Sequence, residues 1–135
     1  MKRLNSILVG LSLFTLAACD TASPAFRDVP AQRITIGKSS FDVRVKDSRA
    51  EALRLNAEWA PRLDAVAGRA TMAIETVSGC KVKRLYGDQA MVKADLSCQG
   101  RPATPAPRGP LYCEPDGPAQ VIGEELVYEI TCEVG

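Results

Sequence analysis

The sequence predicts an α+β domain in which antiparallel β-hairpins form a curved sheet, packed against one amphipathic helix and held by two disulfides. Three observations predict this class: short segments in which apolar and polar residues alternate, one segment with apolar residues three and four apart, and four cysteines in the second half of the chain. Alternation is typical of half-buried strands, and the wider spacing is typical of a helix. The 135 residues suffice for one such domain and are too few for two.

The first expected elements are strands at 34–36 and 41–45, joined by a turn through Gly37. Apolar residues of 41–45 alternate with charged ones, as in a strand with one buried face. The next segment, 48–56, fits two structures. Its first four residues match a helix capping box, whereas a turn into a third strand fits equally well. The sequence does not decide between helix and strand here.

A helix is expected over 60–78, with Pro61 in its first turn and Gly79 placed to end it. Trp59, the only tryptophan, comes just before this helix. We expect its ring to pack under the helix, the alternative being a ligand-binding surface. The residues of the predicted apolar stripe are Leu63, Val66, Ala70, Ile74 and Val77.

A second hairpin is expected between Cys80 and Cys98, with its turn at 87–89. If Tyr86 faces Val92, Cys80 falls opposite Cys98. Opposed residues on one face have Cβ atoms about 4.5–5.5 Å apart, which is near the range that a disulfide can close. Cys80–Cys98 is therefore the preferred bridge, and the other two connectivities of the four cysteines stay open.

The chain then continues through a loop with four prolines at 99–110, which is expected to be a stiff surface connection. After it come a strand at 111–114, a turn at 115–118 and a long final strand. From Leu111 to Gly135 there are six acidic residues and no Lys or Arg. Two interpretations fit: these strands neutralise the basic hairpin at 80–98, which we prefer, or they offer an acidic face to a basic partner. The acidic residues are Glu114, Asp116, Glu124, Glu125, Glu129 and Glu133.

The N-terminus has the parts of an export signal: Lys2 and Arg3, an apolar stretch from 7 to 18, and the sequence Leu-Ala-Ala before Cys19. The apolar stretch is shorter than the roughly 20 residues of a membrane-spanning helix. The ending resembles the lipobox of bacterial lipoproteins. This resemblance implies cleavage before Cys19, a lipid on Cys19, and attachment to the cell membrane or outer membrane facing the periplasm. Asp20 resembles a residue that retains lipoproteins in the inner membrane, but the sequence does not decide between the two membranes.

The expected organisation is a signal peptide at 1–18, a lipidated N-terminus with a flexible tether at 19–33, and a single globular domain at 34–135. Removing residues 1–18 from the 135 leaves 117, with 15 basic and 16 acidic side chains. This balance predicts no nucleic-acid partner.

Five cysteines become an even set of four once Cys19 is assigned to lipid. In an exported chain an even set predicts disulfides, and the spacing contains no close Cys-x-x-Cys pair for zinc. We expect no metal and no cofactor. The four cysteines are Cys80, Cys98, Cys113 and Cys132.

The chain has no histidine, which removes the commonest general base and transition-metal ligand. Among carboxylates, Asp88 and Asp95 are the nearest candidate pair for catalysis, and Ser78 with Lys81 is a formal dyad. Each has an ordinary structural explanation, so we expect no enzyme and no catalytic residue.

The resulting expectation is a non-catalytic module that binds or scaffolds another envelope protein while anchored through Cys19. The alternative is an inhibitor or immunity-type lipoprotein that blocks a lytic enzyme with a loop such as 99–110 or 114–118.

Overall fold

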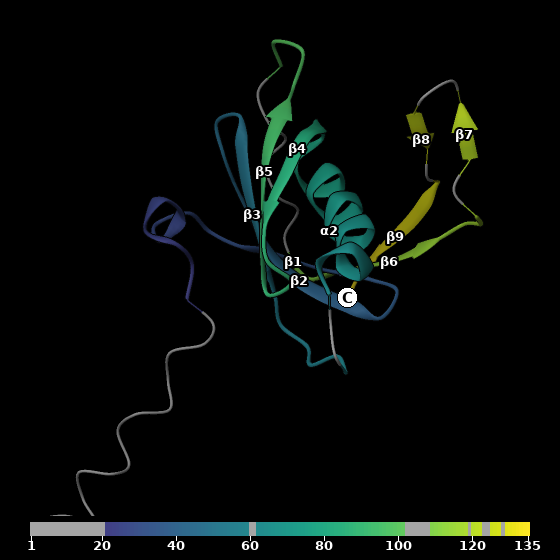
Figure 1. Ribbon diagram of the computed structural model, residues 1–135, viewed down its shortest axis with the longest axis horizontal. Helices are drawn as coiled ribbons and strands as arrows, with labels where there is room; N and C mark the ends of the chain where they lie inside the picture. The colour runs from purple at the N-terminus through teal and green to yellow at the C-terminus, as the bar shows by residue number, and fades with distance from the viewer. Residues whose placement is uncertain (1–20, 60–61, 102–108, 119, 123–124, 128) are drawn as a thin grey trace, which may run out of the picture.

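A seven-stranded mixed sheet with one helix packed on it forms the body of the protein (Figure 1). The sheet is open, with one strand free at each edge. The structure is a computed structural model. It describes residues 21–59, 62–101, 109–118, 120–122, 125–127 and 129–135.

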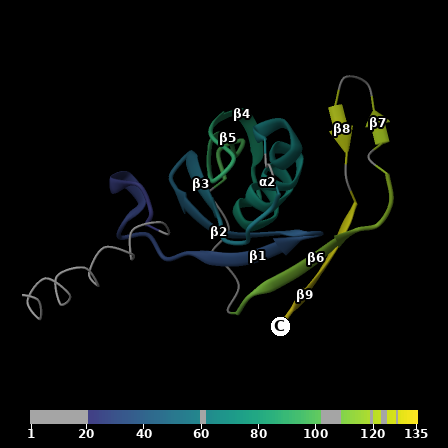
Figure 2. The same cartoon turned by 60° about the horizontal axis from the view of Figure 1, so that its bottom comes forward.

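The strand order across the sheet is β4-β5-β3-β2-β1-β6-β9, and a separate pair, β7 and β8, extends beyond β6 and β9 (Figure 2). Neighbours in the sheet are antiparallel except β1 and β6, which are parallel. The expectation of a purely antiparallel sheet is wrong at this pair, because alternation of apolar residues carries no information on strand direction. The strands are β1 (Gln32–Ile36), β2 (Ser39–Lys46), β3 (Arg49–Arg54), β4 (Lys81–Gly87), β5 (Met91–Ser97), β6 (Leu111–Pro115), β7 (Gln120–Ile122), β8 (Glu125–Val127) and β9 (Ile130–Val134).

The ambiguous segment at 48–56 folds as strand β3 in the middle of the sheet. Ala52 is opposite Val43 of β2 on one side and Val92 of β5 on the other. Its small side chain is fully buried beneath the helix layer. Pairing on both edges satisfies the backbone of β3, which outweighs the helix propensity of its alanine, leucine and glutamate residues.

The helix α2 (Leu63–Ser78) begins three residues later than the predicted start, and residues 60–61 lie outside the described part. Gly79 ends it in the left-handed conformation (φ 67°), donating its N–H to the carbonyl of Glu75. The helix packs chiefly on β1 to β5. The largest fully buried apolar side chains of this interface are Phe41, Ile34, Ile36, Ile74, Val43, Val66 and Val92.

Both preferred disulfides are present. Cys80 pairs with Cys98 and Cys113 with Cys132, with Cα–Cα distances of 4.6 and 4.1 Å. Bridges that close loops of 18 and 19 residues each stabilise the fold by about 3 kcal/mol. The register near Cys80 agrees with the prediction, but a bulge at the fourth strand places Tyr86 opposite Lys93 instead of Val92.

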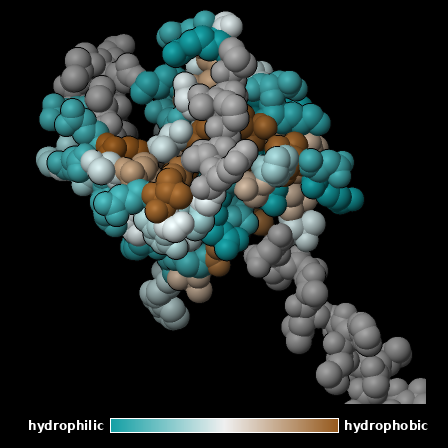
Figure 3. All heavy atoms as spheres, turned by 180° about the vertical axis from the view of Figure 1, so that it is seen from behind, coloured by the Kyte–Doolittle hydropathy of each residue, from teal (hydrophilic) through white to brown (hydrophobic). Residues whose placement is uncertain are grey.

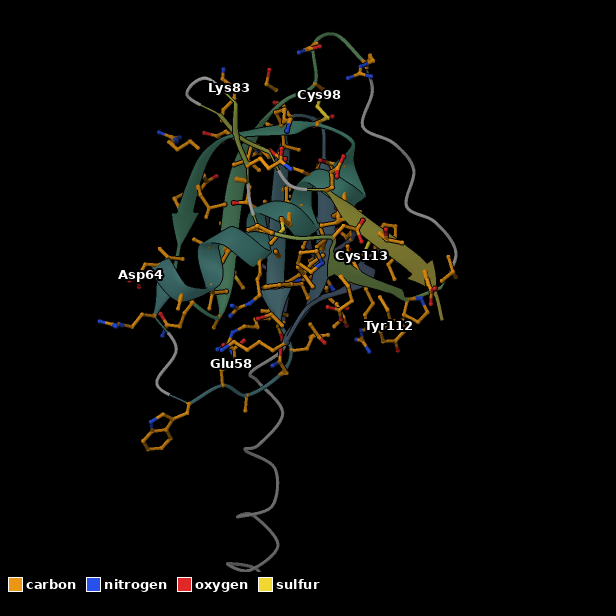
Figure 4. All side chains as sticks on the ribbon, turned by 90° about the vertical axis from the view of Figure 1, so that its right-hand side faces the viewer. Glu58, Asp64, Lys83, Cys98, Tyr112 and Cys113 are labelled. Atoms are coloured by element: carbon orange, nitrogen blue, oxygen red, sulfur yellow. A yellow bond between two sulfur atoms is a disulfide. The ribbon has the colours of Figure 1, made fainter. Side chains whose placement is uncertain are left out.

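The predicted long final strand is divided into β8 and β9, which belong to different sheets. Strand β9 lies at the edge of the large sheet that is opposite β4. Figure 4 shows Lys83 of β4 and Tyr112 of β6 on opposite sides of the molecule. The preferred interpretation, in which the acidic residues pair across neighbouring strands with the basic hairpin, is therefore wrong, because four strands lie between β9 and β5 in the sheet order.

Segments from the early and late parts of the described chain lie side by side where β1 pairs with β6. Ile34 lies opposite Leu111, and the Gln32 side chain donates a hydrogen bond to the carbonyl of Gly109, 77 residues away (2.6 Å). Viewed from behind, apolar surface gathers in a band across the middle of the molecule, with hydrophilic surface around it (Figure 3).

Candidate functional site

The start of the described chain is packed against the sheet face that the helix leaves open. A short 3-10 helix, η1 (Pro24–Phe26), lies over β2. Phe26 and Ala22 are buried, with 4% and 8% of their surfaces exposed. Residues 21–33 were expected to be flexible tether, and this part of the expectation differs from the structure. Burial of these two apolar side chains contributes to holding the segment on the sheet.

A buried carboxylate fixes this segment. Glu51 of β3 is fully buried, and its two oxygens lie 3.0 and 3.3 Å from the backbone N of Ser23, which donates to them. In the sheet register, Glu51 lies between Arg44 of β2 and Lys93 of β5. Buried carboxylates need compensating charge or hydrogen bonds, and the docked backbone N–H of Ser23 supplies hydrogen bonds to Glu51.

Arg44 is unusual among the described residues because its Nε and Nη1 atoms are buried without a hydrogen-bond partner. Other charges on this face form ordinary cross-strand pairs. Arg33 binds Asp42 (2.9 Å), and Arg84 binds Asp95 (2.7 Å). On this face of the sheet, ion pairs between neighbouring strands therefore lie around the covered carboxylate of Glu51.

A second polar cluster holds the loop between β3 and α2. Ser39 donates to Glu58 Oε1 (2.5 Å) and accepts from Arg69 Nε (2.6 Å). Arg69 also binds both oxygens of Glu58 (3.1 and 3.3 Å), and Arg54 lies 3.8 Å from Oε1. The Glu58 side chain is 11% exposed, and Ser39 is fully buried. We call Ser39, Arg54, Glu58 and Arg69 the loop latch; Figure 4 shows Glu58 at the lower end of the domain.

The chemistry of the loop latch is structural. The hydroxyl of Ser39 lowers the pKa of Glu58 below its ordinary value of 4.5, and Arg69, Arg54 and Lys38 lower it further, against the opposing effect of burial. A carboxylate with a lowered pKa is a weak general base. The Ser39 hydroxyl is also inaccessible to a substrate. The arrangement therefore favours positioning of the loop over nucleophilic catalysis.

The loop latch presents Trp59, which follows Glu58 directly. Its ring is 98% exposed, so the expectation that it packs under the helix is wrong. The contacts of Glu58 hold the middle of the loop between β3 and α2, while the indole of Trp59 projects into solvent. Tryptophan is enriched among the residues that dominate binding interfaces.

The remaining predicted residues take structural positions. Asp88 Oδ1 accepts hydrogen bonds from the backbone N of Ala90 and Met91 (both 2.8 Å), and Asp95 is paired with Arg84 as above. Ser78 is fully buried and accepts from the backbone N of Cys80, whereas Lys81 binds Glu75 (3.3 Å). The structure does not bring these residues together as a reactive group.

Other predicted positions fall partly or wholly outside the described residues. Cys19 and the signal segment lie outside them, as does most of the 99–110 loop. The segment 114–118 is described, and its residues are exposed. In the described part of the chain, no group of His, Cys, Asp and Glu side chains could hold a metal, and no helix is long and apolar enough to cross a membrane.

One cavity of about 370 Å³ lies where the C-terminal end of α2 faces β9. Met72 and Ile130 form apolar parts of its wall, and Glu75, Lys81 and Arg101 form charged parts. Its walls combine both charge signs, which defines no single class of ligand.

No protein family, curated protein or solved structure matches this chain.

The loop latch and the docking of residues 22–26 were not predicted from the sequence. Members of the latch are separated by up to 30 residues, and no local spacing links them. Phe26 was the available sign of docking, as an isolated large apolar residue in a segment rich in small and polar ones.

Replacing Phe26 should release the N-terminal segment. Phe26→Ala loses burial of about 3 kcal/mol, so trypsin should cleave after the exposed Arg27 more than about tenfold faster. Timed proteolysis with mass spectrometry measures this rate. Ala25→Ser, at an exposed position in the same turn, is the matched control. An unchanged rate for Phe26→Ala would show that this side chain does not hold the segment.

Replacing Glu58 should weaken the fold in a pH-dependent way. At pH 7, Glu58→Gln should lower the free energy of unfolding by about 2 kcal/mol, because it removes charge-assisted bonds to Ser39 and Arg69. Since the pKa of Glu58 is lowered in the folded state, its contribution is present above its ordinary value of 4.5 and is lost as the pH falls below it.

Urea denaturation across this pH range tests the sign. The curves of wild type and Glu58→Gln should converge as the pH falls, whereas the exposed control Glu129→Gln should follow wild type throughout. A difference that persists or grows in acid would refute the role of the ionised carboxylate.

Proposed function

We propose that this protein is a lipid-anchored lipoprotein of the cell envelope, attached through Cys19, that binds or scaffolds another envelope protein without catalysing a reaction. The observation that carries the anchor is the cysteine pairing. Two disulfides use four of the five cysteines, which leaves Cys19 as the available thiol in a sequence that resembles a lipobox. Disulfides also suit an oxidising compartment.

The docked N-terminal segment shortens the proposed tether. Ala22 is buried and Ser23 is hydrogen-bonded to Glu51, so only residues 20 and 21 lie between Cys19 and the packed part of the chain. Three residue steps at about 3.5 Å each reach roughly 10 Å. The proposed anchor therefore holds the domain next to the bilayer, with limited freedom to turn away.

The binding role is supported by Trp59. A tryptophan that is 98% exposed contributes little to stability, yet the loop latch holds its neighbour in place. An aromatic side chain has few rotatable bonds and therefore loses little conformational entropy on binding. We propose that Trp59 contacts the envelope partner.

Mass spectrometry of the mature protein tests the anchor. We expect an N-terminal Cys19 carrying acyl chains, and recovery of the protein in the membrane fraction. Cys19→Ser should remove both properties while the two disulfides still form. Cleavage at another position, or an unmodified Cys19 thiol, would overturn the proposed anchor.

Site-specific photocrosslinking in cells tests the contact at Trp59. A photoreactive phenylalanine at position 59 should give a discrete crosslinked product, and the same residue at exposed position 64 should not. Trp59→Ala should change the free energy of unfolding by less than about 0.5 kcal/mol. No product at position 59, or identical products at both positions, would contradict this contact.

A further inference from the structure

The two free edges of the sheet differ in how open they are to another strand. At β4, the bulge between Val82 and Arg84 disrupts the ladder, and exposed Lys83 lies at the bulge. Bulges and edge lysines are devices that block edge-to-edge pairing. At β9, five consecutive residues pair in regular register with β6 and contain neither lysine nor proline. Among the described residues, the β9 edge therefore has none of these protective features.

The hydrogen bonds of β9 show which backbone groups face outward. Gly135 donates to the carbonyl of Pro110 (2.9 Å), and the carbonyl of Glu129 accepts from Asp116 (2.9 Å). Residues 129 and 135 therefore face β6. Consistently, Cys113 and Cys132 have a Cα–Cα distance of 4.1 Å, which is typical of a non-hydrogen-bonded antiparallel pair. The N–H and C=O groups of Ile130, Cys132 and Val134 consequently point to the free edge.

The charged side chains of β6 and β9 are all acidic, whereas Lys81 and Arg101 line the cavity beside Ile130 at one end of the edge. Exposed carboxylates of β6, β9 and their connections lie here, and none has an ion-pair partner among the described residues. The chain contains no Lys or Arg after Arg108. Pairing of β9 with β9 of a second copy would bring like charges together, which disfavours it. The four described carboxylates are Glu114, Asp116, Glu129 and Glu133.

Apolar surface is available beside the same edge. The helix packs chiefly on β1 to β5, which leaves Val134 60% exposed and Ile130 half-buried. On the other face, the Tyr112 ring is 54% exposed. A strand added at β9 would therefore find backbone hydrogen bonds, an apolar contact and acidic neighbours together.

We propose that β9 binds an extended segment of a partner protein, which adds an eighth strand to the sheet and places basic side chains at alternate positions against the acidic residues. In such strand addition, the backbone provides affinity and alternate side chains provide specificity. The inference uses a different surface from Trp59 and does not depend on the anchor at Cys19.

A pair of short, end-capped peptides of identical length tests the proposal with the purified full-length protein. One alternates lysine with threonine, and the other replaces each lysine by glutamate. At about 1 mM peptide, where weak complexes are populated, the lysine peptide should slow amide exchange at Ile130, Cys132 and Val134 by about fivefold or more. The glutamate peptide should not.

Three variants locate the interaction. Val134→Pro removes one outward N–H without removing a donor to β6, and should weaken lysine-peptide binding about tenfold, whereas Val134→Thr keeps that N–H and should bind normally. Replacing both Glu129 and Glu133 by lysine should reverse the preference in favour of the glutamate peptide. Protection of β4 amides, binding that ignores Val134→Pro and the charge reversal, or no protection by either peptide would overturn the proposal.

Discussion

The coverage of a seven-stranded sheet by one helix is the constraint on which the rest of this structure depends. Seven strands at about 4.8 Å spacing span roughly 29 Å, whereas a helix with its side chains is about 10 Å across. The helix α2 is therefore placed over the centre and one side, chiefly on β1 to β5. Each margin of the sheet has another means of support. The Cys80–Cys98 bridge joins β4 to the end of β5, and the Cys113–Cys132 bridge joins β6 to β9.

The same constraint explains the opposite face. An open sheet face buries little unless another segment covers it, and residues 22–26 cover only the part around Glu51. The rest of that face tolerates water because its charges pair across strands, as in Arg33 with Asp42 and Arg84 with Asp95. The protein thus combines a conventional apolar core on one face with a small, polar-centred contact on the other.

Local patterns in the sequence predicted the features that depend on neighbouring residues. The period-two alternation between Cys80 and Cys98 places those cysteines opposite each other, and the disulfide follows from that geometry. Gly79 ends the helix because the left-handed conformation there suits glycine. The predicted register beyond the bulge was wrong by one residue, because the residue types of the strand do not indicate a bulge at Lys83.

Features set by tertiary neighbours could not be predicted in the same way. The loop latch joins Ser39, Glu58 and Arg69 from three separate segments, and Trp59, which follows Glu58, is exposed. The separation of acidic and basic strands depends on strand order, which the charges themselves do not determine.

The parallel pairing of β1 with β6 has a consequence for the order of assembly. Ile34 and Leu111 are partners in the sheet although 76 residues lie between them in the chain. The strands β2 to β5 and the helix α2 all belong to this intervening part. Closing so long a loop costs entropy that local hairpins do not require. Strand β1 therefore has no partner on its second edge until the C-terminal part of the chain is available, and truncation there would uncover a central strand rather than trim an end.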